Sequence, residues 1–116
     1  MNIEELREYC LGKPGTTEDF PFDSEVLVFR VLGKIFLLTP VSAHPPQFNA
    51  KCDPERAVEL RGKYDSIKPG YHMNKQHWNT VVADGSVPKK LLLELIDHSY
   101  ELIRNSLPKK QRDTLQ

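Results

Sequence analysis

The stretch VLVFRVLGKIFLLT, residues 26–39, contains two runs of β-branched and aromatic residues on either side of a Leu32-Gly33 link. Such runs favour β-strands, and a two-residue connection that contains glycine is typical of a β-hairpin. We therefore predict strands over 26–31 and 34–39, with Pro40 ending the second strand because it cannot donate a ladder hydrogen bond.

The residues before this hairpin predict one helix and one irregular segment. Asn2 is a favourable N-cap and Glu5 stands at the acidic position of a capping box, so a helix is expected over 2–12. Prolines, threonines and acids dominate 13–23, which predicts an irregular segment held by two aromatic residues, Phe20 and Phe22.

Beyond the hairpin, paired prolines predict a loop over 42–46, and alternation of Phe48 with polar neighbours predicts a strand over 47–52. Asp53-Pro54 is a strong helix start, and Gly62 weakens the end of that helix. The run 67–70 ends in Pro-Gly and suits a type II turn.

The C-terminal third predicts two short strands and the longest helix. The strands are expected over 71–73 and 78–82, on either side of a polar bend. A helix follows Pro88, since apolar residues recur at helical spacing and polar residues occupy the opposite arc. Pro108 ends this helix, and we expect 109–116 to be a frayed basic tail.

The resulting order is helix, two or three strands, helix, two strands, helix. Helices segregated from a mainly antiparallel sheet are typical of an α+β two-layer sandwich. Residues 1–108 are therefore expected to form a single domain, which at this size needs no disulfide or metal for its stability. Nothing in the chain predicts an oligomer, so we expect a monomer.

Composition is that of a globular protein, with 39% hydrophobic and 28% charged residues and a net charge of zero. The charge is unevenly distributed: residues 1–25 hold seven acids and two bases, whereas residues 26–90 hold ten bases and five acids. Such segregation can give a fold one acidic side and one basic side, and local potential governs encounter with charged partners.

The subcellular location expected from the sequence is the cytoplasm. The first residues, MNIEELREY, lack the basic start and apolar stretch of a signal peptide, and no run approaches the length of a membrane span. Cys10 and Cys52 are accordingly expected to remain reduced rather than to form a disulfide.

The stretch PGYHMNKQHWNTV, residues 69–81, holds two histidines, a lysine and the single tryptophan. No catalytic motif ties a base to a nucleophile here or elsewhere, so the protein is not expected to be an enzyme. His72 and His77 do not complete the three or four ligands that a zinc site requires. We therefore expect no metal and no cofactor.

The same stretch interleaves cations with aromatic rings, the combination that phosphate contact and base stacking require. A two-stranded ribbon can also enter a DNA groove with its tip. Within this stretch we expect Tyr71, Met73 and Trp78 to face inward as core anchors and Lys75 with the two histidines to form the exposed face.

The chain resembles the MmcQ/YjbR family of small bacterial proteins from its first helix almost to residue 110. The segments that carry the resemblance are PGTTEDFPF (14–22), VLVFRVLGKIF (26–36), KCDPERAVELR (51–61), PGYHMNKQHWNTV (69–81), LIDHSYELI (95–103) and LPKK (107–110).

This resemblance implies a CyaY-like, frataxin-like α+β fold. Family members are commonly described as DNA-binding through a double wing of hairpins, a description that rests on structural analogy. On that model we expect a surface for double-stranded DNA made of Arg30, Lys34, Lys51, Lys68, His72, Lys75 and His77.

Two other functions stay open. The surface YHMNKQHW (71–78) could instead serve a non-enzymatic adaptor that binds a protein or a small ligand. Analogy with frataxins also suggests iron binding by acids of the first helix and first strand, namely Glu4, Glu5, Glu8, Glu18 and Asp19. Acids in a first helical turn also stabilise the helix dipole, which makes iron the weakest of the three hypotheses.

Overall fold

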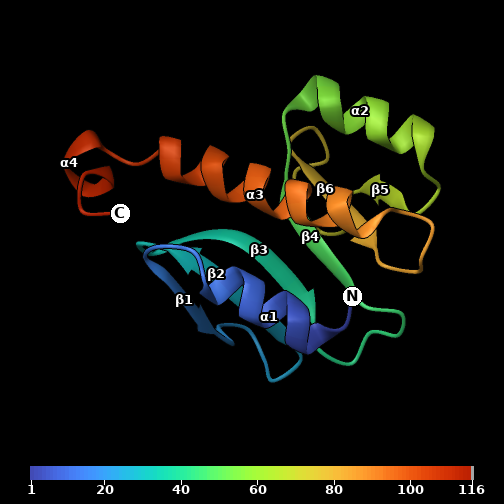
Figure 1. The fold of residues 1–116 in the computed structure, drawn as a ribbon, viewed down its shortest axis with the longest axis horizontal. Coiled ribbons are helices and arrows are strands. Elements are labelled where there is room, and N and C mark those ends of the chain that lie inside the picture. Colours follow the sequence, from blue (N-terminus) through green and yellow to red (C-terminus); the bar gives the residue numbers. More distant parts are fainter. Residues whose placement is uncertain (116) are drawn as a thin grey trace.

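The computed structural model describes residues 1–115 as a six-stranded antiparallel sheet whose helices pack on one face (Figure 1). The order of strands across the sheet is β1-β2-β3-β4-β6-β5. The predicted α+β two-layer architecture is confirmed. The elements are α1 (Ile3–Leu11), β1 (Thr16–Asp19), β2 (Val26–Val31), β3 (Lys34–Pro40), β4 (Gln47–Lys51), α2 (Pro54–Lys63), β5 (Ile67–Pro69), β6 (Trp78–Val82), α3 (Lys89–Asn105) and α4 (Lys109–Arg112).

The central hairpin forms as predicted. Leu32 and Gly33, at φ values of 47° and 89°, make the turn between β2 and β3. Positive φ at both central residues is the geometry that matches the twist of a two-residue hairpin. The predicted helix starts are also confirmed, because Asn2 accepts a hydrogen bond from the N–H of Glu5 and Asp53 accepts one from the N–H of Arg56.

Three sequence predictions are wrong. The segment 13–23 is not wholly irregular, since Thr16–Asp19 pairs with β2 as the edge strand β1. Residues 67–69 form strand β5 rather than a turn, whereas 71–73 form no strand. Each of these segments takes its conformation from whether it pairs with a neighbouring strand. Local composition does not reveal which strand, if any, will be its partner.

The prediction of a frayed C-terminal tail is also wrong for residues 109–115. Residues 109–112 form the short helix α4, and Leu115 packs against the core. The reason is apolar contact, because Leu115 reaches the backbone of Gly15 near the start of β1. Residue 116 lies outside the described residues.

One hydrophobic core fills the space between the sheet and the helices. It joins Leu6 and Cys10 of α1 and Leu60 of α2 to the sheet residues Phe29 and Phe48, together with the apolar side of α3. Cys10 and Cys52 are both buried and free, as expected. Within residues 1–115, no helix combines the length and apolar character needed to cross a membrane.

Candidate functional site on the open face of the sheet

The sheet has a second face, which no helix of the described chain covers. Side chains alternate along each strand, so the neighbours of core residues on the strands point to this side. We call it the open face. Its side chains include Arg30, Lys51, Lys68, Asn49, Gln47 and Thr80, with Val28 and Leu38 as apolar members outside the main core cluster.

A loop over residues 70–77, which we call the histidine loop, folds back onto this face. Thr80 on β6 is its anchor: the Thr80 hydroxyl donates to Asn49 Oδ1 at 2.5 Å and accepts from the N–H of Tyr71 at 3.1 Å. The Asn49 amide donates in turn to the Tyr71 carbonyl at 3.4 Å. Both backbone polar groups of Tyr71 are therefore satisfied by the open face.

Arg61 of α2 fixes the other side of the histidine loop. Its Nε donates to Asn79 Oδ1 at 2.7 Å, and its Nη2 donates to the carbonyl oxygens of Lys75 and Trp78. One guanidinium thus joins α2, the loop and β6, which suits the fork of donors that arginine presents. Sequence reasoning missed Arg61 as a part of this site, because an arginine that binds carbonyls has no sequence signature.

The predicted DNA-binding residues lie at one end of the sheet. The β2–β3 turn and the histidine loop both leave the sheet at the end where β4 finishes at Lys51, because all neighbouring strands are antiparallel. Lys51 and Lys68 project from the open face on either side of β6. Lys34 is exposed beside the β2–β3 turn.

Two of the predicted bases already have partners. Arg30 Nε donates to Asp19 Oδ1 at 2.9 Å across the β1–β2 ladder, and Lys75 Nζ donates to the Gly70 carbonyl at 3.2 Å. Figure 1 also shows β2 and β3 splaying away from β4, β5 and β6. The structure therefore places Lys51, Lys68 and the histidine loop in one neighbourhood, and Arg30 with Lys34 in another.

The aromatic residues of the loop are arranged differently from the expectation. Tyr71 is 68% exposed, so its prediction as a core anchor is wrong. The reason is that residues 71–73 form a loop over the sheet instead of a strand within it. Trp78 and Met73 are half-buried, His72 is exposed and His77 is half-buried.

A hollow of about 490 Å³ lies on the open face between the histidine loop and the segment that precedes β2. Val26, Leu38 and Pro40 supply its apolar surface, Phe22 and the loop residues 71–73 stand around it, and Gln47 and Asn49 contribute amides. Sequence reasoning missed this hollow, because it forms between segments about fifty residues apart. The one available signal was Phe22, an aromatic residue in a polar segment that no strand pattern explained.

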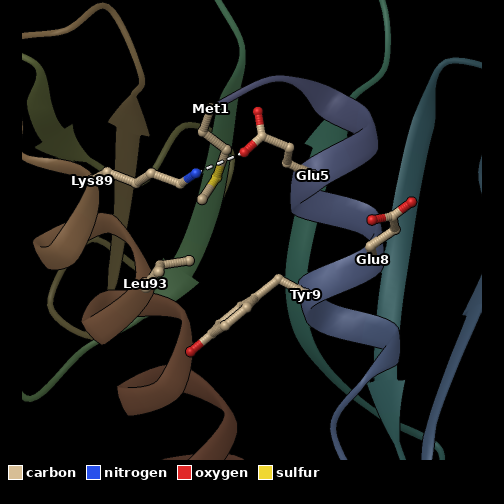
Figure 2. Close-up of a pocket in the computed structure, with 6 residues that line it drawn as sticks. All are labelled: Met1, Glu5, Glu8, Tyr9, Lys89 and Leu93. Carbon is tan, nitrogen blue, oxygen red and sulfur yellow. Dashed lines mark hydrogen bonds and ion pairs between the residues drawn. The ribbon is translucent and has the colours of Figure 1, made fainter.

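A second hollow lies between α1 and α3 on the opposite side of the sheet, and Figure 2 shows Glu5 and Tyr9 projecting from α1 toward α3. Lys89 donates to Glu5 at 2.8 Å, and this ion pair lowers the pKa of Glu5. The Tyr9 hydroxyl donates to Asp97 at 2.7 Å, and burial followed by this hydrogen bond raises the pKa of Tyr9 to about 12. These contacts hold α1 against α3.

The acids considered for iron are largely engaged with bases. Glu5 pairs with Lys89, Glu18 with Arg7 and Asp19 with Arg30. Among residues 1–115, no three histidine, cysteine, aspartate or glutamate side chains are grouped so that they could hold a metal ion. The geometry gives the iron hypothesis no ligand set.

Comparisons with known proteins agree with the fold. The chain is 35% identical to the YjbR protein of Escherichia coli over 99% of this chain and 98% of that protein. It is 37% identical to the YbdF protein of Escherichia coli over 94% of this chain and 89% of that protein.

Solved structures give the same result. A crystal structure of a Deinococcus radiodurans protein with a DUF419 domain is 44% identical, with a TM-score of 0.92 over 97% of this chain and 86% of that one. A Pseudomonas syringae protein is 30% identical, with a TM-score of 0.77 over 89% of this chain and 99% of that one. The model of the YjbR family matches residues 11–102. The chain therefore belongs to the YjbR family.

Proposed function

We propose that this protein binds double-stranded DNA without catalysing a reaction, as a cytoplasmic monomer. The contact surface is the end of the open face that carries the β2–β3 turn and the histidine loop. Arg30, Lys51, Lys68 and Lys75 are its phosphate contacts, with His72 and His77 beside them. Lys34 is a further phosphate contact at the adjoining β2–β3 turn, where it is paired with the core residue Val31 and so projects from the other side of the sheet.

The observation that supports this proposal is the position of Lys51 and Lys68 on the same face, on either side of β6. Neither forms an ion pair within residues 1–115, so both positive charges are available to phosphates. The acidic helix α1 packs on the other face of the sheet. Repulsion between the acids of α1 and DNA therefore acts from the far side of the sheet.

Charge reversal on the open face tests the proposal. Binding of a mixed-sequence duplex is followed by fluorescence anisotropy at about 50 and about 200 mM salt, because each phosphate contact contributes a slope of about −0.9 in log K against log salt. The variant Lys51→Glu with Lys68→Glu should lose most of the affinity. It should also reduce the magnitude of the salt slope by about 2, one unit for each contact that is lost.

The matched control is Lys63→Glu with Lys90→Glu, which changes net charge equally at exposed helix positions. This control should retain most of the wild-type affinity and the wild-type salt slope. Equal loss in both double variants, or no binding by the wild type at about 50 mM salt, would overturn the proposal. Thermal melts establish that each variant is folded before its affinity is interpreted.

A further inference from the structure

We propose that the hollow on the open face binds one small planar heteroaromatic molecule that carries a lactam edge, an adjacent ring N–H and C=O. This binding site adjoins the proposed DNA surface at His72, which lines the hollow, whereas the phosphate contacts Lys51 and Lys68 do not line it. Its volume of about 490 Å³ lies within the range of about 300–1,000 Å³ that is usual for small-molecule pockets.

Aromatic side chains define the shape of the ligand. Phe22 and Tyr71 are each 68% exposed, and both line this hollow from segments distant in sequence. Large aromatic groups left in water at one concave site indicate a binding surface rather than a structural need. Flat rings between a phenylalanine and a tyrosine gain offset-stacked or edge contacts, so a planar ligand is favoured over a globular one.

The floor of the hollow is apolar and belongs to rigid strands. Leu38 of β3 is only 8% exposed although no helix of the described chain covers it. Val26 of β2 and Pro40 of β3 lie beside it, since these two residues are directly paired across the ladder. A ligand ring placed here would exchange contact with water for contact with these three side chains.

Gln47 supplies the group that selects a lactam. Its side chain lines the hollow from β4 and forms no hydrogen bond within residues 1–115, whereas neighbouring Asn49 is engaged with Thr80 and Tyr71. A primary amide offers one acceptor and one donor side by side, which match a ring N–H and its adjacent C=O. The Gln47 amide is thus available to a ligand.

The wall opposite Phe22 is preorganised. His72 has a φ of 58°, a left-handed conformation that is uncommon for a residue other than glycine. It is maintained by the hydrogen bonds of Tyr71 to Thr80 and Asn49 on one side of His72 and by the Arg61 contacts on the other. Strain held by surrounding structure is characteristic of binding sites, and a fixed wall loses little entropy when a ligand enters.

Two probes of matched size test this inference: quinazolin-4-one, a planar bicyclic lactam, and naphthalene, which has no polar edge. Each is titrated into ¹⁵N-labelled protein and followed by NMR. Quinazolin-4-one should shift the amides of residues 22–26, 47–49 and 71–73 with a dissociation constant below about 1 mM. Absence of saturable shifts at these amides would overturn the proposal.

Substitutions separate the roles of the walls and the amide. Gln47→Leu should weaken quinazolin-4-one about tenfold and naphthalene less than about twofold, because only the lactam loses hydrogen bonds. Phe22→Ala and Tyr71→Ala should weaken both probes about tenfold. The matched control is Phe20→Ala, which removes an exposed aromatic ring of the same segment that does not line this hollow.

Three results would contradict the inference. Equal weakening of both probes by Gln47→Leu would show that the lactam edge does not bind the Gln47 amide. If Phe20→Ala weakened the probes as much as Phe22→Ala does, the probes would not be bound in this hollow. Shifts of the same amides with protein concentration alone would show that a second copy of the chain covers this face. None of these three results depends on DNA binding. If the proposal of a small-molecule site is contradicted, the proposed binding of DNA is still tested separately by the charge-reversal experiment.

Discussion

The hydroxyl of Ser99 on α3 accepts a hydrogen bond of 2.8 Å from the main-chain N–H of Lys51 on β4. The same hydroxyl donates to the carbonyl oxygen of Phe36 on β3. Since β3 and β4 pair directly at Leu37–Ala50 and Leu38–Asn49, the next ladder bond would join Phe36 and Lys51. Ser99 takes the place of that bond, so β3 and β4 separate at the end where the basic residues lie.

Ser99→Ala should therefore destabilise the protein more than a lost surface hydroxyl would. Ser99 is fully buried, and its removal leaves one backbone N–H and one carbonyl without partners. Each unsatisfied group costs about 1–3 kcal/mol, so the free energy of unfolding should fall by about 2–4 kcal/mol in urea denaturation. Ser106→Ala, at an exposed residue after the same helix whose hydroxyl donates only to the Ile103 carbonyl, should change it by less than about 1 kcal/mol.

The role of Ser99 also shows how far the sequence predicts this fold. Helical spacing predicted the apolar arc of α3, turn composition predicted the hairpin and capping residues predicted the helix starts, because these features depend on neighbours along the chain. Helical spacing could not reveal that the Ser99 hydroxyl takes the place of a hydrogen bond between β3 and β4. The strand β1 was missed for the same reason, since its pairing with β2 compensates for a composition that suits an irregular segment.

The candidate site was predicted only in part. The stretch 69–81 was identified as a recognition surface from its composition, and the histidine loop within it does lie on the open face. The orientation of Tyr71 was wrong, and Phe22 and Gln47 were absent from the predicted site. Each of these residues lines the hollow only because two loops and strand β4, distant in the sequence, meet on one face of the sheet, and no local sequence pattern reveals such a contact.

Arg61→Met should loosen the histidine loop. The substitution leaves the side-chain Oδ1 of buried Asn79 and the main-chain carbonyls of Lys75 and Trp78 without their charged donor. Hydrogen bonds to charged groups contribute about 1.5–3 kcal/mol, so we expect destabilisation of that order and faster amide hydrogen exchange over 70–77. Lys63→Met on the same helix is the control, and equal acceleration in both variants would contradict the role of Arg61.

Gly70→Ala should distort the same loop for a steric reason. A Cβ at Gly70 would lie 2.9 Å from Trp78 Cβ, 3.0 Å from the Trp78 carbonyl oxygen and 3.1 Å from Met73 Cβ. The nearest atoms belong to backbone or to Cβ positions, which cannot rotate away. We expect a loss of about 1–3 kcal/mol in stability and a change in Trp78 fluorescence. Gly62→Ala in α2, where nothing lies within 4 Å, should stabilise by up to about 1 kcal/mol.

His98 predicts how stability depends on pH in mildly acidic solution. Its Nε2 accepts a 3.0 Å hydrogen bond from the N–H of Asp53, which only the neutral ring can do. Burial, reinforced by Arg56 and opposed by Asp53, lowers the pKa of His98 from 6.5. The unfolded chain thus binds this proton more readily, so the stabilising effect is present above about pH 6.5 and is lost as the pH falls through the lower, folded value.

Urea denaturation between about pH 7 and about pH 5 measures this loss, because the carboxylates with lowered pKa values, such as Glu5 and Glu18, titrate below 4.5. His98→Gln keeps a side-chain acceptor but cannot titrate, so its free energy of unfolding should change less across this window than that of the wild type. His44→Gln, at an exposed loop position, should follow the wild type. A wild-type protein equally stable at both ends of the window would show that folding does not lower the pKa of His98, and would contradict this prediction.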